Sequence, residues 1–176
     1  VNAKLVFLNS WSNSQRAKEV INSLRREADG WVLPRENLIF SSEEGKEWEL
    51  GVPQKVVRDM LLVANLFILP SQSETFSVSM LEASACKNLL LLNDDLQVMH
   101  ELVADNALYS GFGSEWGGTR TSREYHPNPQ AFFMDEAKRI LEELKKNKAL
   151  SQQRRTFGLF NSDYVWRNQL QPLIEQ

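Results

Sequence analysis

The sequence has little of what marks several classes of protein. Its 176 residues contain one cysteine, Cys86, which rules out an intrachain disulfide and fits a reducing, cytoplasmic location. The two histidines, His100 and His126, stand far apart without cysteine partners, so no metal site is predicted. No bound cofactor is expected either. The apolar runs are also far shorter than a membrane span requires.

A strong charge of one sign is missing as well. The net charge is −3 and the basic residues form no block, so no nucleic-acid partner is expected. The composition, 42% hydrophobic and 24% charged, is typical of a globular protein, and this length can bury the core of one domain. We therefore treat residues 1–176 as one domain, and the strand-like segment close to Val1 predicts that it is cut from a longer chain.

Short apolar runs alternate with helical patterns along most of the chain. Runs typical of buried strands occupy residues 4–8, 37–40, 66–69, 89–92 and 106–110. Apolar residues at helical spacing lie between them, at 17–28, 53–64, 77–85 and 95–103. This alternation predicts an α/β fold with a single doubly wound, Rossmann-like parallel sheet and helices on both faces.

The last third of the sequence is organised differently. Residues 110–130 are rich in glycine and polar residues, which predicts a long surface loop. Three helical patterns follow, at residues 137–144, 150–157 and 162–174. We expect three helices to close the chain.

Two glutamates flank the start of the predicted helix after the third strand, in the segment PSQSETFSVSMLEASA. Ligands of open parallel sheets bind beyond the carboxyl ends of the strands, so Glu74, in the loop leaving such an end, is expected to face a crevice. Thr75 or Ser77 is suited to cap the helix. The free N–H groups and the dipole at the start of this helix suit a phosphate group.

The second glutamate, Glu82, falls on the expected apolar stripe of the same helix, formed by Val78, Leu81 and Ala85. A carboxylate on a buried face costs free energy unless something bonds to it. A ribose offers two adjacent hydroxyls, and one carboxylate can accept a hydrogen bond from both. Plain alternatives are a solvated loop residue for Glu74 and a cap or salt bridge for Glu82.

The same segment resembles the motif of the retaining GT-B glycosyltransferases of the group 1, GT4-like family. The shared pattern is a Pro-Ser loop, a glutamate, seven residues, and a second glutamate followed by alanine and a small residue, an E-x7-E motif. The flanking segments GVPQKVVRDMLLVANLFILPS, LLLLNDDLQVMHELV and FNSDYVWRNQLQPLI are similar to the family as well. The resemblance implies the C-terminal, donor-binding half of a GT-B fold.

The resemblance also implies roles for individual residues. Glu82 would bind the ribose hydroxyls of a nucleotide diphosphate sugar, and Glu74 would face the donor sugar near its anomeric carbon as the catalytic residue. The remaining donor-binding residues would be Thr75, Phe76 and Ser77 at the diphosphate or sugar, Phe40 and Ser41 at the nucleobase, and Ser10 and Trp11 at the border of the pocket.

The sequence departs from the family pattern at several points. Thr-Phe-Ser follows Glu74 where the family has Gly-Phe-Gly, and KNL stands where the family has Gly-x-Pro. The family's basic Arg and Lys pair and its N-terminal acceptor domain would lie upstream of Val1. The resemblance therefore implies that the missing part binds the acceptor and makes any peripheral membrane contact, and that the isolated chain is inactive.

Other classes of protein share this coarse pattern. A receiver domain needs an aspartate at the end of the third strand, where this chain has Pro70 and Ser71. An FMN-binding, flavodoxin-like domain would use the loop NSWSNS for phosphate, with Trp11 and Trp116 around the flavin. A non-catalytic nucleotide-sugar-binding module would carry the same motif, so the sequence leaves the last two alternatives open.

Overall fold

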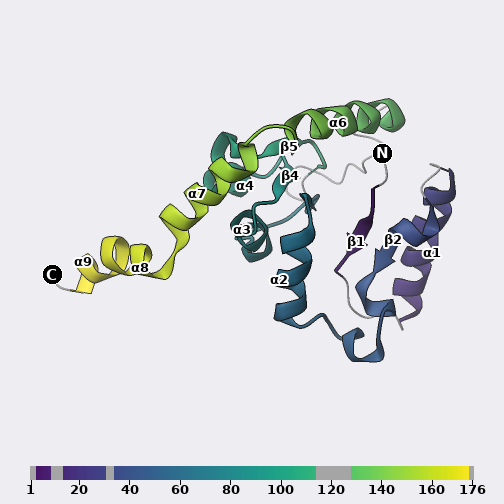
Figure 1. Ribbon diagram of the computed structural model, residues 1–176, viewed down its shortest axis with the longest axis horizontal. Coiled ribbons are helices and arrows are strands. Elements are labelled where there is room, and N and C mark those ends of the chain that lie inside the picture. Colours follow the sequence, from purple (N-terminus) through teal and green to yellow (C-terminus); the bar gives the residue numbers. More distant parts are fainter. Residues whose placement is uncertain (1–2, 9–13, 31–33, 114–127, 175–176) are drawn as a thin grey trace. The chain divides into compact units, whose positions relative to one another are not determined.

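The computed structural model describes residues 3–8, 14–30, 34–113 and 128–174, in two compact units formed by residues 1–59 and 60–176 (Figure 1). Helix α2, Gln54–Val63, crosses the boundary between the two ranges. Among the described residues, no helix combines the length and the apolar character that crossing a membrane would require. Each unit contains parallel strands and its own helices.

The first unit is built on two short parallel strands. Strand β1, Leu5–Phe7, pairs with β2, Leu38–Phe40, and Phe7 lies beside Phe40 in the register. Helix α1, Gln15–Gly30, packs on these strands through Ile21 and Ala28. Single turns of 3-10 helix occupy Arg35–Asn37, Ser41–Glu43 and Lys46–Trp48.

The second unit contains a three-stranded parallel sheet. Its strands are β3, Leu66–Leu69, β4, Leu89–Asn93, and β5, Leu108–Ser110, in the order β3-β4-β5. Strand β4 is central, and every one of its residues is buried. Successive side chains of a strand point to opposite faces, so both faces of β4 are covered.

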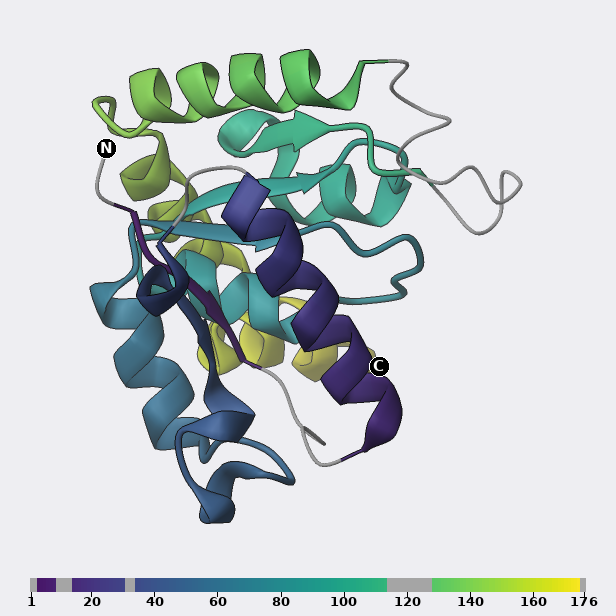
Figure 2. The ribbon, with the colours of Figure 1, turned by 90° about the vertical axis from the view of Figure 1, so that its right-hand side faces the viewer.

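Helices enclose this sheet. They are α3, Val78–Ala85, α4, Gln97–Val103, α6, Pro129–Glu143, and α7, Lys148–Phe160, with a 3-10 turn at Ala104–Asn106. Figure 2 shows α6 along the β5 side of the sheet, where Ile140 packs on Leu89, Leu91 and Leu108. Helix α7 contacts both α3 and β4. The chain continues through α8, Ser162–Val165, a π-helical turn, Trp166–Leu170, and α9, Gln171–Ile174.

The predicted α/β class, with parallel strands flanked by helices, is confirmed. Strand β3 has the predicted bounds, and β4 extends one residue further, to Asn93. The described strands are hydrogen-bonded as two sheets, β1-β2 and β3-β4-β5, where a single sheet was expected. Each of these ladders joins strands of the same unit.

Helix α6 begins well before the predicted pattern at residues 137–144. The Asn128 side chain caps it by accepting a hydrogen bond from the Ala131 N–H at 3.1 Å, and Pro129 is its first residue. An Asn cap followed by Pro is a standard start signal, and it ends the predicted loop of residues 110–130 early. Residues 114–127 of that loop lie outside the described residues.

Some predicted apolar faces are less buried than expected. Leu5 and Val6 of β1 are each 39% exposed, because among the described residues β1 has a paired neighbour only on its β2 side. Trp166 and Ile174, on the stripe predicted for residues 162–174, are 51% and 70% exposed.

Candidate functional site

The segment with the two glutamates connects β3 to α3. The loop leaves the carboxyl end of β3 at Leu69, and α3 begins at Val78. The Ser77 hydroxyl caps the helix, accepting a hydrogen bond from the Met80 N–H at 3.3 Å. The predicted helix start and cap are thereby confirmed, and the cap residue itself is buried.

The buried face of α3 differs from the predicted stripe. Met80, Ala83 and Ser84 are the buried residues of the helix, whereas Val78 is 58% exposed. At 100° per residue, Glu82 lies on the side of the helix away from these three. The predicted stripe faced the wrong way because a serine, Ser84, occupies a core position that apolar periodicity does not detect. Glu82 is half-buried on the outer side.

The loop residues assigned to the donor differ in exposure. Glu74 is half-buried, Thr75 is exposed, and the Phe76 ring is 50% exposed. Glu82 follows the Ser77 cap by five residues, which places it roughly 7 Å further along the helix axis. The connection between β3 and α3 therefore carries two half-buried carboxylates, Glu74 in its loop and Glu82 on the helix. The loop leaves the sheet at the carboxyl end of β3.

One residue at this edge was missed by the sequence analysis. Asn93, the last residue of β4, is fully buried and bonds to three loops that leave the sheet. Its amide nitrogen donates to the Ser71 carbonyl oxygen at 2.9 Å and to that of Gly113 at 2.6 Å. Gly113 has φ +85°, a left-handed conformation that glycine adopts at little cost. An asparagine that directly ends an apolar strand was the available signal.

Acidic residues follow Asn93. Asp94 and Asp95 form a turn, and the cap of α4 is Leu96, which makes no side-chain capping bond. His100 Nε2 lies 3.1 Å from an Asp94 carboxylate oxygen. In the part of the chain that the structure describes, no group of three or more His, Cys, Asp or Glu side chains is arranged to hold a metal ion.

The tyrosine next to this turn has a perturbed pKa. The Tyr109 ring stacks on His100 with 4.1 Å between centroids, and its hydroxyl donates to the Ala104 carbonyl oxygen at 2.6 Å. Burial, followed by the negative charges of Asp105 and Asp94, raises the pKa of Tyr109 to about 12.

Two further predicted site residues, Phe40 and Ser41, lie in the first unit and are both buried. The Phe40 ring stacks on Phe7 at 4.9 Å, and the Arg25 guanidinium lies 5.3 Å from the centre of the Phe40 ring. Phe40 is therefore a core residue of this unit as well as a predicted base contact. Ser10 and Trp11, predicted to border the donor pocket, lie outside the described residues.

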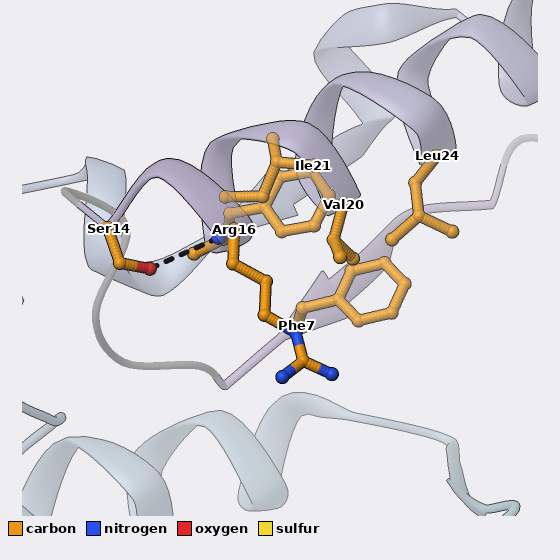
Figure 3. A pocket seen from close by; sticks show the side chains of 8 residues that line it. Phe7, Ser14, Arg16, Val20, Ile21 and Leu24 are labelled. Atoms are coloured by element: carbon orange, nitrogen blue, oxygen red, sulfur yellow. Dashed lines mark hydrogen bonds between the residues drawn. The ribbon is translucent and has the colours of Figure 1, made fainter.

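Phe40 also lines a pocket of about 330 Å³ in this unit. Figure 3 shows the Phe7 ring beside α1, near Val20 and Leu24, with the Arg16 side chain alongside. Val20, which belongs to the apolar helical pattern of residues 17–28, is 53% exposed. The pocket is lined by Phe7, Ser14, Arg16, Ala17, Val20, Ile21, Leu24 and Phe40.

Comparison with known families gives a match over part of the chain. Residues 43–116 match the family described as glycosyl transferases group 1. This range covers less than half of the 176 residues and contains β3, α3, β4, α4 and β5, together with Glu74 and Glu82. The match supports the family resemblance found in the sequence. The chain matches none of the curated proteins with which it was compared.

Proposed function

We propose that this chain is the nucleotide-sugar donor-binding domain of a retaining GT-B glycosyltransferase. The observation that carries the proposal is the connection between β3 and α3, where Glu74 lies in the loop and Glu82 on the helix, within the segment that matches the group 1 family. In open parallel sheets this edge is where ligands bind.

The two carboxylates are assigned different tasks. Glu82, on the outer side of α3, accepts hydrogen bonds from both ribose hydroxyls of the donor. Glu74, half-buried in the loop, faces the sugar near its anomeric carbon. The sugar then passes from the nucleotide diphosphate to an acceptor with retention of the anomeric configuration. The family resemblance assigns the acceptor to a separate N-terminal domain, so transfer is proposed for the full enzyme and not for this chain alone.

Charge on the leaving diphosphate is met by the backbone. The exposed Thr75 and Phe76 and the cap residue Ser77 offer N–H groups at the start of α3, where the helix dipole favours an anion. Thr75 and Ser77 replace the glycines of the family pattern, which restricts how closely the backbone can approach the phosphates.

The experiment that tests this function is calorimetric binding of UDP, GDP and ADP and of their sugars. Glu82→Ala is expected to weaken the best nucleotide by roughly thirtyfold to a thousandfold, because two charge-assisted hydrogen bonds are lost. The wild type should bind a 2′,3′-dideoxy nucleotide more weakly than the ordinary nucleotide by the same factor. The Glu82→Ala variant should bind the two nucleotides with almost equal affinity.

Glu101→Ala serves as the matched control, since Glu101 is an exposed carboxylate on the nearby helix α4. The melting temperature is measured on both variants. A destabilised Glu82→Ala protein that binds nucleotide as tightly as the wild type would end the ribose assignment. A yellow purified protein would favour the FMN-binding alternative, and a full enzyme that binds donor but transfers no sugar would favour a non-catalytic module.

A further inference from the structure

The side chain of Asn93 joins three loops at the carboxyl edge of the second unit's sheet. Its amide nitrogen donates to the carbonyl oxygens of Ser71 and Gly113, as described above. Its amide oxygen accepts hydrogen bonds from the Asp95 N–H at 3.1 Å and the Phe112 N–H at 3.0 Å. All four bonds are therefore made to backbone groups.

The orientation of this amide follows from its partners. The nitrogen meets two carbonyl oxygens, and the oxygen meets two N–H groups. Rotating the amide by 180° would place donor against donor and acceptor against acceptor at every one of these contacts. Since Asn93 is fully buried, water cannot replace bonds that a different side chain leaves unmade.

The position of β4 explains why one side chain can reach these loops. β4 is the central strand, so its last residue lies between the exits of β3 and β5. In the register, Leu69 pairs with Leu92, which places Pro70 beside Asn93. Pro70 has no N–H group, so it cannot extend the ladder of backbone hydrogen bonds. Beyond it, the Asn93 side chain makes the connection by donating to the carbonyl oxygen of Ser71.

Two further bonds connect the same loops. The Gln72 side chain donates to the Phe112 carbonyl oxygen at 2.8 Å, and the Asp95 carboxylate accepts from the Gly113 N–H at 2.8 Å. The loop that carries Glu74 is thus attached at Ser71 and Gln72, immediately before the residues assigned to the donor.

We propose that Asn93 is a positioning residue, which fixes the Glu74 loop against the loop after β5 and so prepares this edge to receive the donor. The effect of Asn93 on donor binding rests on the proposed function. Its attachment of the two loops does not depend on that function. Asn93 contacts no reacting group and acts only through the backbone of its neighbours.

A matched control lies at the opposite end of the same strand. Asn88 precedes β4, is also fully buried, and donates to two backbone carbonyl oxygens, those of Leu61 at 2.8 Å and Ala83 at 3.2 Å. Asn88→Ala and Asn93→Ala therefore remove the same kind of buried amide from the two ends of one strand. A purely structural role would make the two variants behave alike.

The first measurement is hydrogen exchange of the unliganded chain, with stability recorded by urea unfolding. Asn93→Ala should speed exchange of the amides at residues 71–77 and 111–113 by about tenfold or more, while Asn88→Ala leaves them within about threefold. Equal acceleration of both loops in the two variants, or unchanged exchange in Asn93→Ala, would overturn the proposal. If either alanine variant fails to fold, Asn93→Asp and Asn88→Asp are compared in the same way.

The second measurement is affinity for the nucleoside diphosphate that binds the wild type best. Asn93→Ala should weaken it by about tenfold because the loop must first be ordered, and Asn88→Ala should leave it nearly unchanged. Loop exchange that changes as expected with no change in affinity would refute the link to the donor. A wild-type chain that binds no nucleotide would refute the proposed function, and the exchange result would still decide the role of Asn93.

Discussion

Ser84 and Thr156 lie 72 positions apart in the sequence, and their hydroxyl oxygens lie 2.6 Å apart in the buried interface between α3 and α7. Gln152, also fully buried, donates its amide to the same Thr156 oxygen at 3.2 Å. The helix that carries Glu82 is therefore anchored to α7 by buried polar contacts.

This contact should be visible in a double-mutant cycle. Thr156→Val leaves the Ser84 hydroxyl and the Gln152 amide without their partner, and we expect it to lower the free energy of unfolding by about 1–3 kcal/mol. Combining it with Ser84→Ala should cost less than the sum of the single changes. Urea unfolding measures all four proteins, with Thr156→Ser as the control that keeps the hydroxyl. Strict additivity would contradict the pairing.

The cap of α3 can be tested by a second pair of serines. Ser77→Ala removes the acceptor of the Met80 N–H and should lower the free energy of unfolding by about 1 kcal/mol. Ser79, in the same turn, is exposed, and its hydroxyl lies 3.3 Å from that of Ser77, so Ser79→Ala leaves the bond to the Met80 N–H in place and should change the free energy of unfolding by less than about 0.5 kcal/mol. Thermal unfolding of both variants makes the comparison, and equal stability of the two would show that Ser77 does not act as a cap.

Glu74 should affect the reaction more than nucleotide binding. In the full enzyme, Glu74→Gln keeps the shape of the side chain but removes the charge that the proposed function assigns to the region of the anomeric carbon. We expect turnover to fall by about a hundredfold or more, with nucleoside diphosphate affinity within about threefold. Steady-state kinetics and calorimetry test this, with the exposed Glu101→Gln as control. A parallel loss of affinity would make Glu74 a binding residue.

Tyr109 should make stability depend on alkaline pH. Its pKa is raised to about 12 in the folded state, compared with an ordinary value of about 10 in the unfolded chain. Between these values the folded state holds the proton more tightly, so this contribution to stability is complete below pH 10 and is lost as pH rises toward 12.

Tyr109→Phe should remove the part of the alkaline fall in the free energy of unfolding that comes from Tyr109. The variant also loses the hydrogen bond to Ala104. Urea unfolding across this pH range compares the two proteins, and tyrosinate absorbance follows the ionisation directly. If the free energy of unfolding of Tyr109→Phe falls with pH as steeply as that of the wild type, Tyr109 is not the source of the pH dependence.

The element order could be predicted because buried parallel strands have a direct signature. LFIL and LLLL are continuous apolar runs, and they form β3 and β4. The observed bounds of these strands differ from the predicted bounds by at most one residue. The cap of α3 was also predictable, since Ser77 acts through a neighbour three residues away. Interactions between residues close in sequence can be predicted without knowledge of the rest of the fold.

Features that depend on distant partners could not be predicted. Ser84 reads as a surface residue of α3, and only Thr156 on α7 explains its burial. Asn93 reads as a turn residue, and its role depends on Ser71 and Gly113, which follow two other strands. Polar residues in the core are placed by tertiary contacts, and hydrophobic periodicity treats them as exposed.

The complete burial of β4 has a cost before the chain is folded. Four consecutive leucines, Leu89–Leu92, form a segment of high apolar character without charge or proline, which favours strand pairing between chains. In the native sheet, β3 and β5 occupy both of its edges and close this route. Until those neighbours form, the charges of Lys87, Asp94 and Asp95 on either side of the segment are its local protection against aggregation during synthesis.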